Sequence, residues 1–301
     1  MDAALGIVMR WALVSDLMLL FGVPLFALYI PAGVDRAALR STVIATTVLG
    51  LLLSIAGIVV VAAYMGGVAP GEVDRATLAM LVTATAVGSA FMVRLAALAA
   101  ALALGVQNRG SQVVGMAIAL CAAVALGSLA WSGHGVMNDG RTGIVHLVAD
   151  IVHLLAAGVW VGALAALLWR LINTVRDRAG LAHRALEGFA TVGSISVALV
   201  VLTGAINSWL LIGPRNLPSL GTSLYGQLLL AKLALVAGMI SLAAVNRFRL
   251  TPALGGASTQ LAIDRAMLRL RSSVALEAGA AVLVIGLVAW IGTLEPPVST
   301  P

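Results

Sequence analysis

The chain has 301 residues, of which 61% are hydrophobic and 10% are charged. A soluble domain carries about 25% charged residues, so this composition excludes a soluble fold, and its apolar content also excludes disorder. The single cysteine, Cys121, excludes an internal disulfide and any CxxC metal or redox site. The net charge of +6 comes from arginines. In so apolar a chain we interpret them as topology signals, and we expect no nucleic-acid partner.

Eight apolar segments are long enough to cross a lipid bilayer, which takes about 20 residues in a helix. They cover residues 6–30, 41–65, 76–104, 112–132, 144–169, 188–212, 223–246 and 273–294. Inside a bilayer each segment must close its own backbone hydrogen bonds, so we predict helices. The predicted fold class is all-α, a bundle of eight transmembrane helices that forms a single integral membrane domain over residues 1–301. We expect the long third segment to tilt or to extend beyond the bilayer.

The arginines are distributed unevenly between the connections. Twelve follow the first, third, fifth and seventh segments, namely Arg36, Arg40, Arg109, Arg170, Arg176, Arg178, Arg184, Arg247, Arg249, Arg265, Arg269 and Arg271. The opposite connections contain three, namely Arg75, Arg141 and Arg215. Because positively charged loops stay in the cytoplasm, both termini are predicted to face outward. We expect the basic connection 247–272 to carry a short amphipathic helix at 261–270 on the membrane surface.

Five ionisable side chains lie inside the predicted spans, where each is costly: Asp16, Arg94, Asp150, Lys232 and Glu277. We expect Arg94 and Glu277 to form an internal ion pair towards the cytoplasmic side. Lys232 is at a depth from which it could neutralise either Asp16 or Asp150. His183, in a basic connection, is expected to be solvated or to face lipid.

The densest polar cluster surrounds the fifth segment, where three of the four histidines fall within 20 residues on the outward side. On a helix, His146, Asp150 and His153 follow the i, i+4, i+7 spacing and share one face. His146 and His153 are about 10 Å apart along the axis, so they cannot both bind one metal ion. The spacing therefore predicts a ladder of polar side chains that descends from the outer surface, with Trp160 two turns deeper.

Imidazole is the commonest protein ligand for transition metals, and a carboxylate can bind the metal or orient a histidine. His134 and Met137 come from the adjacent outer loop and could complete a site with the ladder. A mixture of imidazole and thioether ligands favours Cu(I).

Several short motifs resemble the copper resistance protein D family. The stretch from His153 to Gly162 is similar to its signature helix, and Gly133-His134-Gly135 to its outward GH motif. Further similar positions follow in the family's order: Phe189, Thr203-Gly204, Asn207, Tyr225-Gly226, Lys232, Asn246-Arg247, Glu277 and Gly279. Ala163 stands where the family usually has a second glycine. The resemblance implies an eight-span bacterial inner-membrane protein that handles copper, often by uptake from periplasm to cytoplasm.

The leading interpretation is a copper permease, with a copper ion, Cu(I) or Cu(II), captured by His134, Met137 and His146 and passed to Asp150 and His153. The chain has no fused copper-chaperone domain, so a separate periplasmic copper-binding protein is the expected donor. The sequence lacks an ATP-binding loop, GxSxG and HExxH, so we expect neither an enzyme nor a self-powered pump.

Two alternatives stay open. One is a membrane scaffold that presents or stores copper without transporting it. The other is a haem-b cytochrome, which needs axial histidines from two facing helices.

Overall fold

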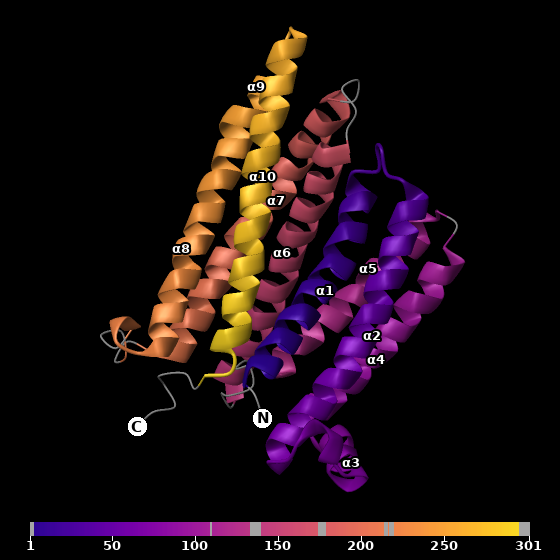
Figure 1. Ribbon diagram of the computed structural model, residues 1–301, viewed down its shortest axis with the longest axis vertical. Helices are drawn as coiled ribbons and strands as arrows, with labels where there is room; N and C mark the ends of the chain where they lie inside the picture. Colours follow the sequence, from indigo (N-terminus) through magenta and orange to yellow (C-terminus); the bar gives the residue numbers. More distant parts are fainter. Residues whose placement is uncertain are drawn as a thin grey trace.

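The computed structural model describes residues 3–108, 110–132, 140–173, 179–213, 216 and 220–294. Within these residues every regular element is helical, and eight helices are long and apolar enough to cross a membrane, which confirms the all-α fold class. Figure 1 shows the long helices running side by side. The elements are α1 (Ala3–Tyr29), α2 (Arg36–Gly66), η1 (Pro70–Glu72), α3 (Arg75–Ala84), α4 (Ala86–Gln107), α5 (Gln112–Gly127), η2 (Ser128–Ser132), α6 (Gly140–Asn173), α7 (Ala179–Ile212), α8 (Leu224–Val245), η6 (Asn246–Leu250), α9 (Thr251–Gly255) and α10 (Gln260–Ile291).

Helices α1 and α6 occupy the centre of the bundle. Helix α1 packs against α2, α5, α6 and α10, while α6 packs against α1, α5, α7 and α10. One apolar core lies around α1, α2, α4 and α5, and a second lies around α6, α7 and α10. The contacts of α1 with α6 and α10 join the two cores. That residues 1–301 form a single membrane domain stays a prediction.

Glycines bring α1 and α6 into backbone contact. A Cβ atom on Gly22 would lie 2.7 Å from the Cα of Gly162 and would collide with the carbonyl oxygen of Gly158. The Gly158/Gly162 pattern is therefore the place where α6 crosses α1, as small residues at this spacing allow. This crossing sets the position of α6, which carries most of the predicted site.

The third predicted span is wrong as a single helix. The segment 76–104 is broken at Thr85 into the short α3 and the membrane-length α4. The Thr85 side chain caps α4 by accepting a hydrogen bond from the Gly88 amide at 2.9 Å. A Cβ atom on Gly88 would collide with the carbonyl oxygens of Leu81 and Val82, so glycine is required at this corner. Helix α3 lies beyond the start of α4, at the same end of the bundle as the start of α1 (Figure 1).

The basic connection 247–272 is also shorter than predicted. Helix α8 continues through a π-helical turn, η6, into α9, which ends at Gly255. Helix α10 then begins at Gln260, where the Thr259 side chain accepts from the Ala262 amide at 3.3 Å. The expected surface helix at 261–270 is instead the first part of α10, and only residues 256–259 separate the two helices.

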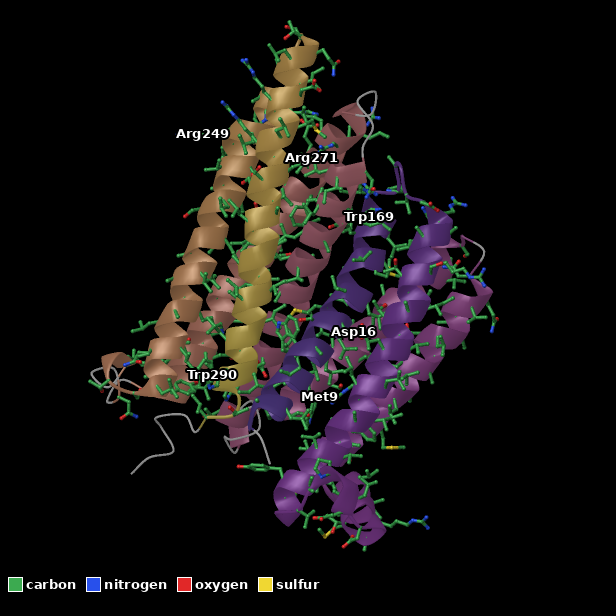
Figure 2. The ribbon with its side chains drawn as sticks, viewed as in Figure 1. Met9, Asp16, Trp169, Arg249, Arg271 and Trp290 are labelled. Atoms are coloured by element: carbon green, nitrogen blue, oxygen red, sulfur yellow. The ribbon has the colours of Figure 1, made fainter. Side chains whose placement is uncertain are left out.

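The two ends of the bundle differ in composition. The beginning of α1 and the end of α10 lie at one end (Figure 1). Arg249 and Arg271 lie towards the opposite end, and the exposed indoles of Trp169 and Trp290 lie near opposite ends (Figure 2). Tryptophan is enriched at both membrane surfaces. That both termini face outward stays a prediction.

The expected ion pair between Arg94 and Glu277 is wrong. Arg94 is buried on α4, and its Nε donates to the Ser128 hydroxyl at 3.0 Å. Glu277 is buried on α10 and accepts hydrogen bonds from Trp160 at 2.8 Å and Asn246 at 3.1 Å. Each buried charge thus has neutral partners on its own side of the bundle.

Candidate functional site

His153 lies on α6 and faces α7. Its Nδ1 is 2.9 Å from the Thr203 hydroxyl oxygen. A Cβ atom on Gly204 would lie 3.4 Å from His153 Cε1, so the glycine leaves α7 open to the imidazole. The His153 ring therefore packs against Thr203 and Gly204 of α7.

The hydrogen bonds of Thr203 decide the tautomer of His153. The Thr203 hydroxyl donates its single proton to the Leu199 carbonyl oxygen at 2.5 Å. Its oxygen is then left to accept, and the His153 Nδ1–H is the donor that faces it. A neutral imidazole that donates through Nδ1 keeps its lone pair on Nε2, the atom that is free to bind a metal ion.

Asp150 lies one turn from His153 and interacts with side chains of three other helices. Asn207 on α7 donates through Nδ2 to Asp150 Oδ1 at 3.3 Å. The charges of Lys232 on α8 and Arg10 on α1 act on the Asp150 carboxyl group. Of the two acidic partners considered for Lys232, the structure favours Asp150.

Arg10 connects this charge cluster to the chain that precedes α6. Its guanidinium donates to the Ser132 carbonyl oxygen at 2.7 Å and to the Gly292 carbonyl oxygen at 2.8 Å. Ser132 is the last described residue before α6. His134 and Met137 lie outside the described residues.

His146 is buried in the first half of α6, with 1% of its surface exposed, and it makes polar or electrostatic interactions of its own. His153 and Asp150 are half-buried. Within the described ranges, no group of three His, Cys, Asp or Glu side chains is close enough to hold a metal ion. A site with three such ligands would need at least one residue outside these ranges.

The fourth histidine, His183, is more enclosed than predicted. Its Nδ1 is 3.4 Å from Glu187 Oε2, and its side chain is 23% exposed. A Cβ atom on Gly255 would collide with the ring, so His183 packs against α9. It lies on the first turns of α7, whereas His153 contacts the last third of that helix at Thr203.

Two family profiles match the chain. One, described as copper resistance protein D-like, N-terminal domain, covers residues 1–144, and the other, described as copper resistance protein D, covers residues 183–291. Copper resistance protein D of Pseudomonas syringae pv. tomato is 41% identical over 306 residues, which is 98% of each chain. The chain belongs to the copper resistance protein D family.

For two further relatives the similarity covers a smaller share of each chain. Inner membrane protein YebZ of Escherichia coli (strain K12) is 32% identical over 56% of this chain and 55% of its own. Copper transport protein CutJ of Bacillus subtilis (strain 168) is 32% identical over 39% of this chain and 21% of its own. No solved structure is significantly similar. With its eight apolar helices, this copper resistance protein D family member is a multi-pass inner-membrane protein with a copper-related function.

Sequence reasoning gave three residues of this copper resistance protein D family member no role in the site: Thr203 and Asn207, which it only matched to the family, and Arg10. Thr203 and Asn207 are four residues apart in an apolar span, and that spacing alone indicates a polar face on α7. Arg10 is a basic residue near the outward end of the first span, against the general arginine distribution. Both signals were available, but neither identifies the partner across the helix interface.

Proposed function

We propose that this protein moves copper ions across the inner membrane, from the outward side to the cytoplasm, through the polar ladder of α6. The names of its relatives support copper as the substrate, since they include a copper resistance protein and a copper transport protein. In this proposal His134, Met137 and His146 capture the ion, and Asp150 and His153 receive it deeper in the membrane. A periplasmic copper-binding protein is the proposed donor.

The geometry of His153 is the observation that carries the proposal. Thr203 fixes the ring through Nδ1 and leaves the Nε2 lone pair for the metal. A metal-binding histidine usually donates its other ring N–H to such an oxygen, which fixes the orientation of the ring. In Thr203, His153 therefore has the hydrogen-bond partner that a metal-binding histidine needs. It also lies within a membrane span, where polar side chains are costly and usually functional.

Asp150 supplies the negative charge on the path. A copper cation that enters the membrane loses hydration, and a nearby carboxylate offsets part of that cost. Lys232 and Arg10 act on Asp150 in the structure. In the proposal the incoming copper cation replaces part of the positive charge that Lys232 and Arg10 place near Asp150, so the carboxylate keeps a countercharge. Ligand exchange between successive side chains then moves the ion inward.

Copper uptake into proteoliposomes tests the proposal. The purified full-length protein is reconstituted in vesicles that contain a copper-sensitive dye, and the dye signal is followed after copper is added outside. We expect uptake by the wild-type protein, none by His153→Ala or His134→Ala, reduced uptake by Asp150→Asn, and normal uptake by His183→Ala. Copper binding without uptake by the wild-type protein would identify a storage scaffold instead. A haem absorption band in the purified protein would identify a cytochrome.

A further inference from the structure

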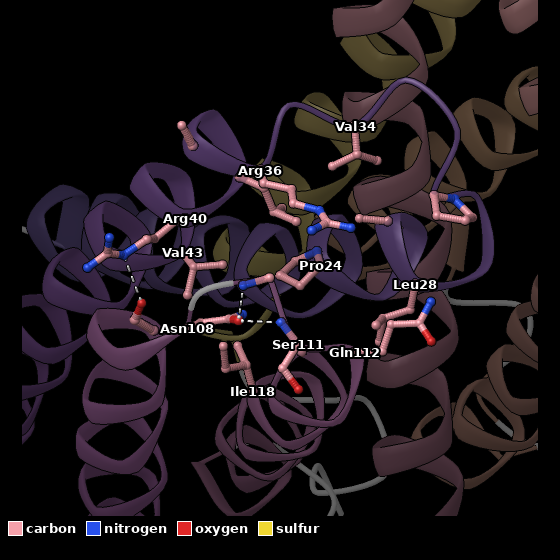
Figure 3. Close-up of a pocket in the computed structure, with 17 residues that line it drawn as sticks. Pro24, Leu28, Val34, Arg36, Arg40, Val43, Asn108, Ser111, Gln112 and Ile118 are labelled. Atoms are coloured by element: carbon pink, nitrogen blue, oxygen red, sulfur yellow. Dashed lines mark hydrogen bonds between the residues drawn. The ribbon is translucent and has the colours of Figure 1, made fainter.

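A cavity of about 290 Å³ lies away from the ladder, between α1, α2, α4 and α5. It is found at the end of the bundle opposite to the start of α1, where the connections between α1 and α2 and between α4 and α5 pass over it (Figure 3). The proposed copper path does not use any of its residues.

The cavity has an apolar depth. Pro24 and Leu28 of α1, Val43 of α2 and Ile118 of α5 line it. From Pro31 at the end of α1 to Pro24 it reaches about 10 Å along the helix, at 1.5 Å per residue. Gly115 also lines it, and a Cβ atom there would lie 3.1 Å from Leu28, so the glycine keeps this part open. The deeper lining is apolar, as a hydrocarbon chain requires.

The mouth of the same cavity is basic. Arg36 and Arg40 are the ionisable residues of the lining, and both are exposed. Arg40 is held by the end of α4, because its Nη2 donates to Val106 at 2.5 Å and its Nε to Gly105 at 3.3 Å. Arg36 crosses Gly110, where a Cβ atom would lie 2.8 Å from Nη1. The Asp35 carboxylate also lies nearby. It caps the start of α2 by accepting hydrogen bonds from the Ala37 and Ala38 amides.

We propose that this cavity binds an anionic phospholipid, with the phosphate at Arg36 and Arg40 and one acyl chain in the apolar depth. Basic pockets between transmembrane helices are suited to anionic lipid head groups, and guanidinium groups match the geometry of phosphate oxygens. A free phosphate ion would bind at the basic mouth and leave the apolar depth unfilled. The basic mouth and the apolar depth together therefore favour a lipid over a free phosphate ion. A bound lipid would join α1 and α2 to the beginning of α5.

Lipid binding to the purified full-length protein in a neutral detergent tests the proposal. Dioleoyl phosphatidylglycerol and dioleoyl phosphatidylcholine are titrated separately, and bound lipid is counted by native mass spectrometry. We expect the anionic lipid to bind more tightly, and Arg36→Gln to weaken its binding about fivefold, as one arginine at a charged membrane surface contributes. Ala27→Phe, which fills the apolar depth without changing the charge, should also weaken binding. Arg249→Gln is the matched control, because Arg249 is exposed at the same end and lies outside the cavity.

Three results would overturn the proposal. Equal binding of the two lipids would show that the mouth does not select charge. An equal loss in Arg249→Gln and Arg36→Gln would show a general charge effect rather than a site. The third result combines two observations: millimolar inorganic phosphate displaces the anionic lipid, and Ala27→Phe binds the lipid as tightly as the wild type. Together they would show that the mouth binds a free phosphate ion and that the apolar depth holds no acyl chain.

Discussion

At the residue scale, one hydroxyl group on α7 determines what His153 can do. Thr203 donates to Leu199 and accepts from His153, so its loss removes the acceptor that holds Nδ1–H. The imidazole could then turn or change tautomer, and Nε2 would no longer be held as the free nitrogen. In the proposed mechanism, a side chain that never touches copper thus controls the availability of the proposed ligand, His153.

We expect Thr203→Val to weaken copper binding about 10- to 100-fold, the usual effect of removing a partner of a metal-binding histidine. Valine keeps the shape of threonine, so the fold is expected to survive. Thr203→Ser keeps the hydroxyl and should bind nearly as well as the wild type. The measurement is a titration of the purified protein against a chromophoric copper chelator.

Ser196→Ala is the matched control for Thr203→Val. It removes a buried hydroxyl from the same helix, one that donates to the Val192 carbonyl oxygen at 2.9 Å. Copper affinity should stay at the wild-type value in this variant. Wild-type affinity in Thr203→Val as well would contradict the role assigned to the hydroxyl.

The sequence predicted that Asp150 and His153 share a helix face, because that follows from 3.6 residues per turn. It could not predict their partners, since these depend on how α6 and α7 are rotated against each other. The same limit explains the error over Arg94 and Glu277. Two opposite charges at similar depth were taken as a pair, but Arg94 lies on α4 and Glu277 on α10, in different halves of the bundle.

At the scale of elements, the crossing of α1 and α6 carries the architecture. Gly22 of α1 and Gly162 of α6 lie so close that a Cβ atom on either would collide with the other helix. Two backbones in contact gain van der Waals energy that larger residues would prevent. The GxxxG pattern predicted a close approach on α6, and the structure identifies α1 as the partner.

We expect Gly162→Ala to destabilise the protein by about 1–3 kcal/mol, as overpacking of a close contact does. Gly279→Ala is the matched control, because a Cβ atom at Gly279 on α10 would meet nothing within 4 Å. Thermal unfolding of both variants in detergent gives the comparison. Equal stability of Gly162→Ala and Gly279→Ala would show that the two helices are not held at this distance.

Hydropathy found the spans but not their ends. The break at Thr85 depends on a side-chain cap and on Gly88, which a hydropathy average does not register. The extension of α10 back to Gln260 depends on a cap at Thr259 in a polar stretch outside the apolar window. In physical terms, a bilayer selects the apolar length, whereas caps decide where each helix begins.

At the scale of the whole molecule, orientation decides which end of the ladder meets copper first. The structure brings the start of α1, the end of α10 and α3 to one end of the bundle (Figure 1). The arginine distribution predicts that this end faces outward, because the connections predicted from the sequence carry twelve arginines on the opposite side and three on this side. In the proposed path the ladder then begins with His146, which is buried near the outward start of α6.

Reporter fusions to the full chain test this orientation. We expect fusions at residue 180 and residue 258 to report a cytoplasmic position, because both lie in or beside arginine-rich connections. A fusion at residue 70, in the opposite connection before α3, should report a periplasmic position. A periplasmic signal at residue 180 or 258 would reverse the proposed direction of the ladder.

The most direct test of the central claim is the copper stoichiometry of the purified protein, measured as metal per chain after removal of loosely bound ions. The ladder predicts that the wild-type protein retains copper, that His134→Ala and His153→Ala lose it, and that His183→Ala, whose histidine contacts Glu187 and α9 instead of the ladder, retains it. Wild-type stoichiometry in folded His134→Ala and folded His153→Ala would contradict the account, and these histidines would then have packing and hydrogen-bonding roles alone.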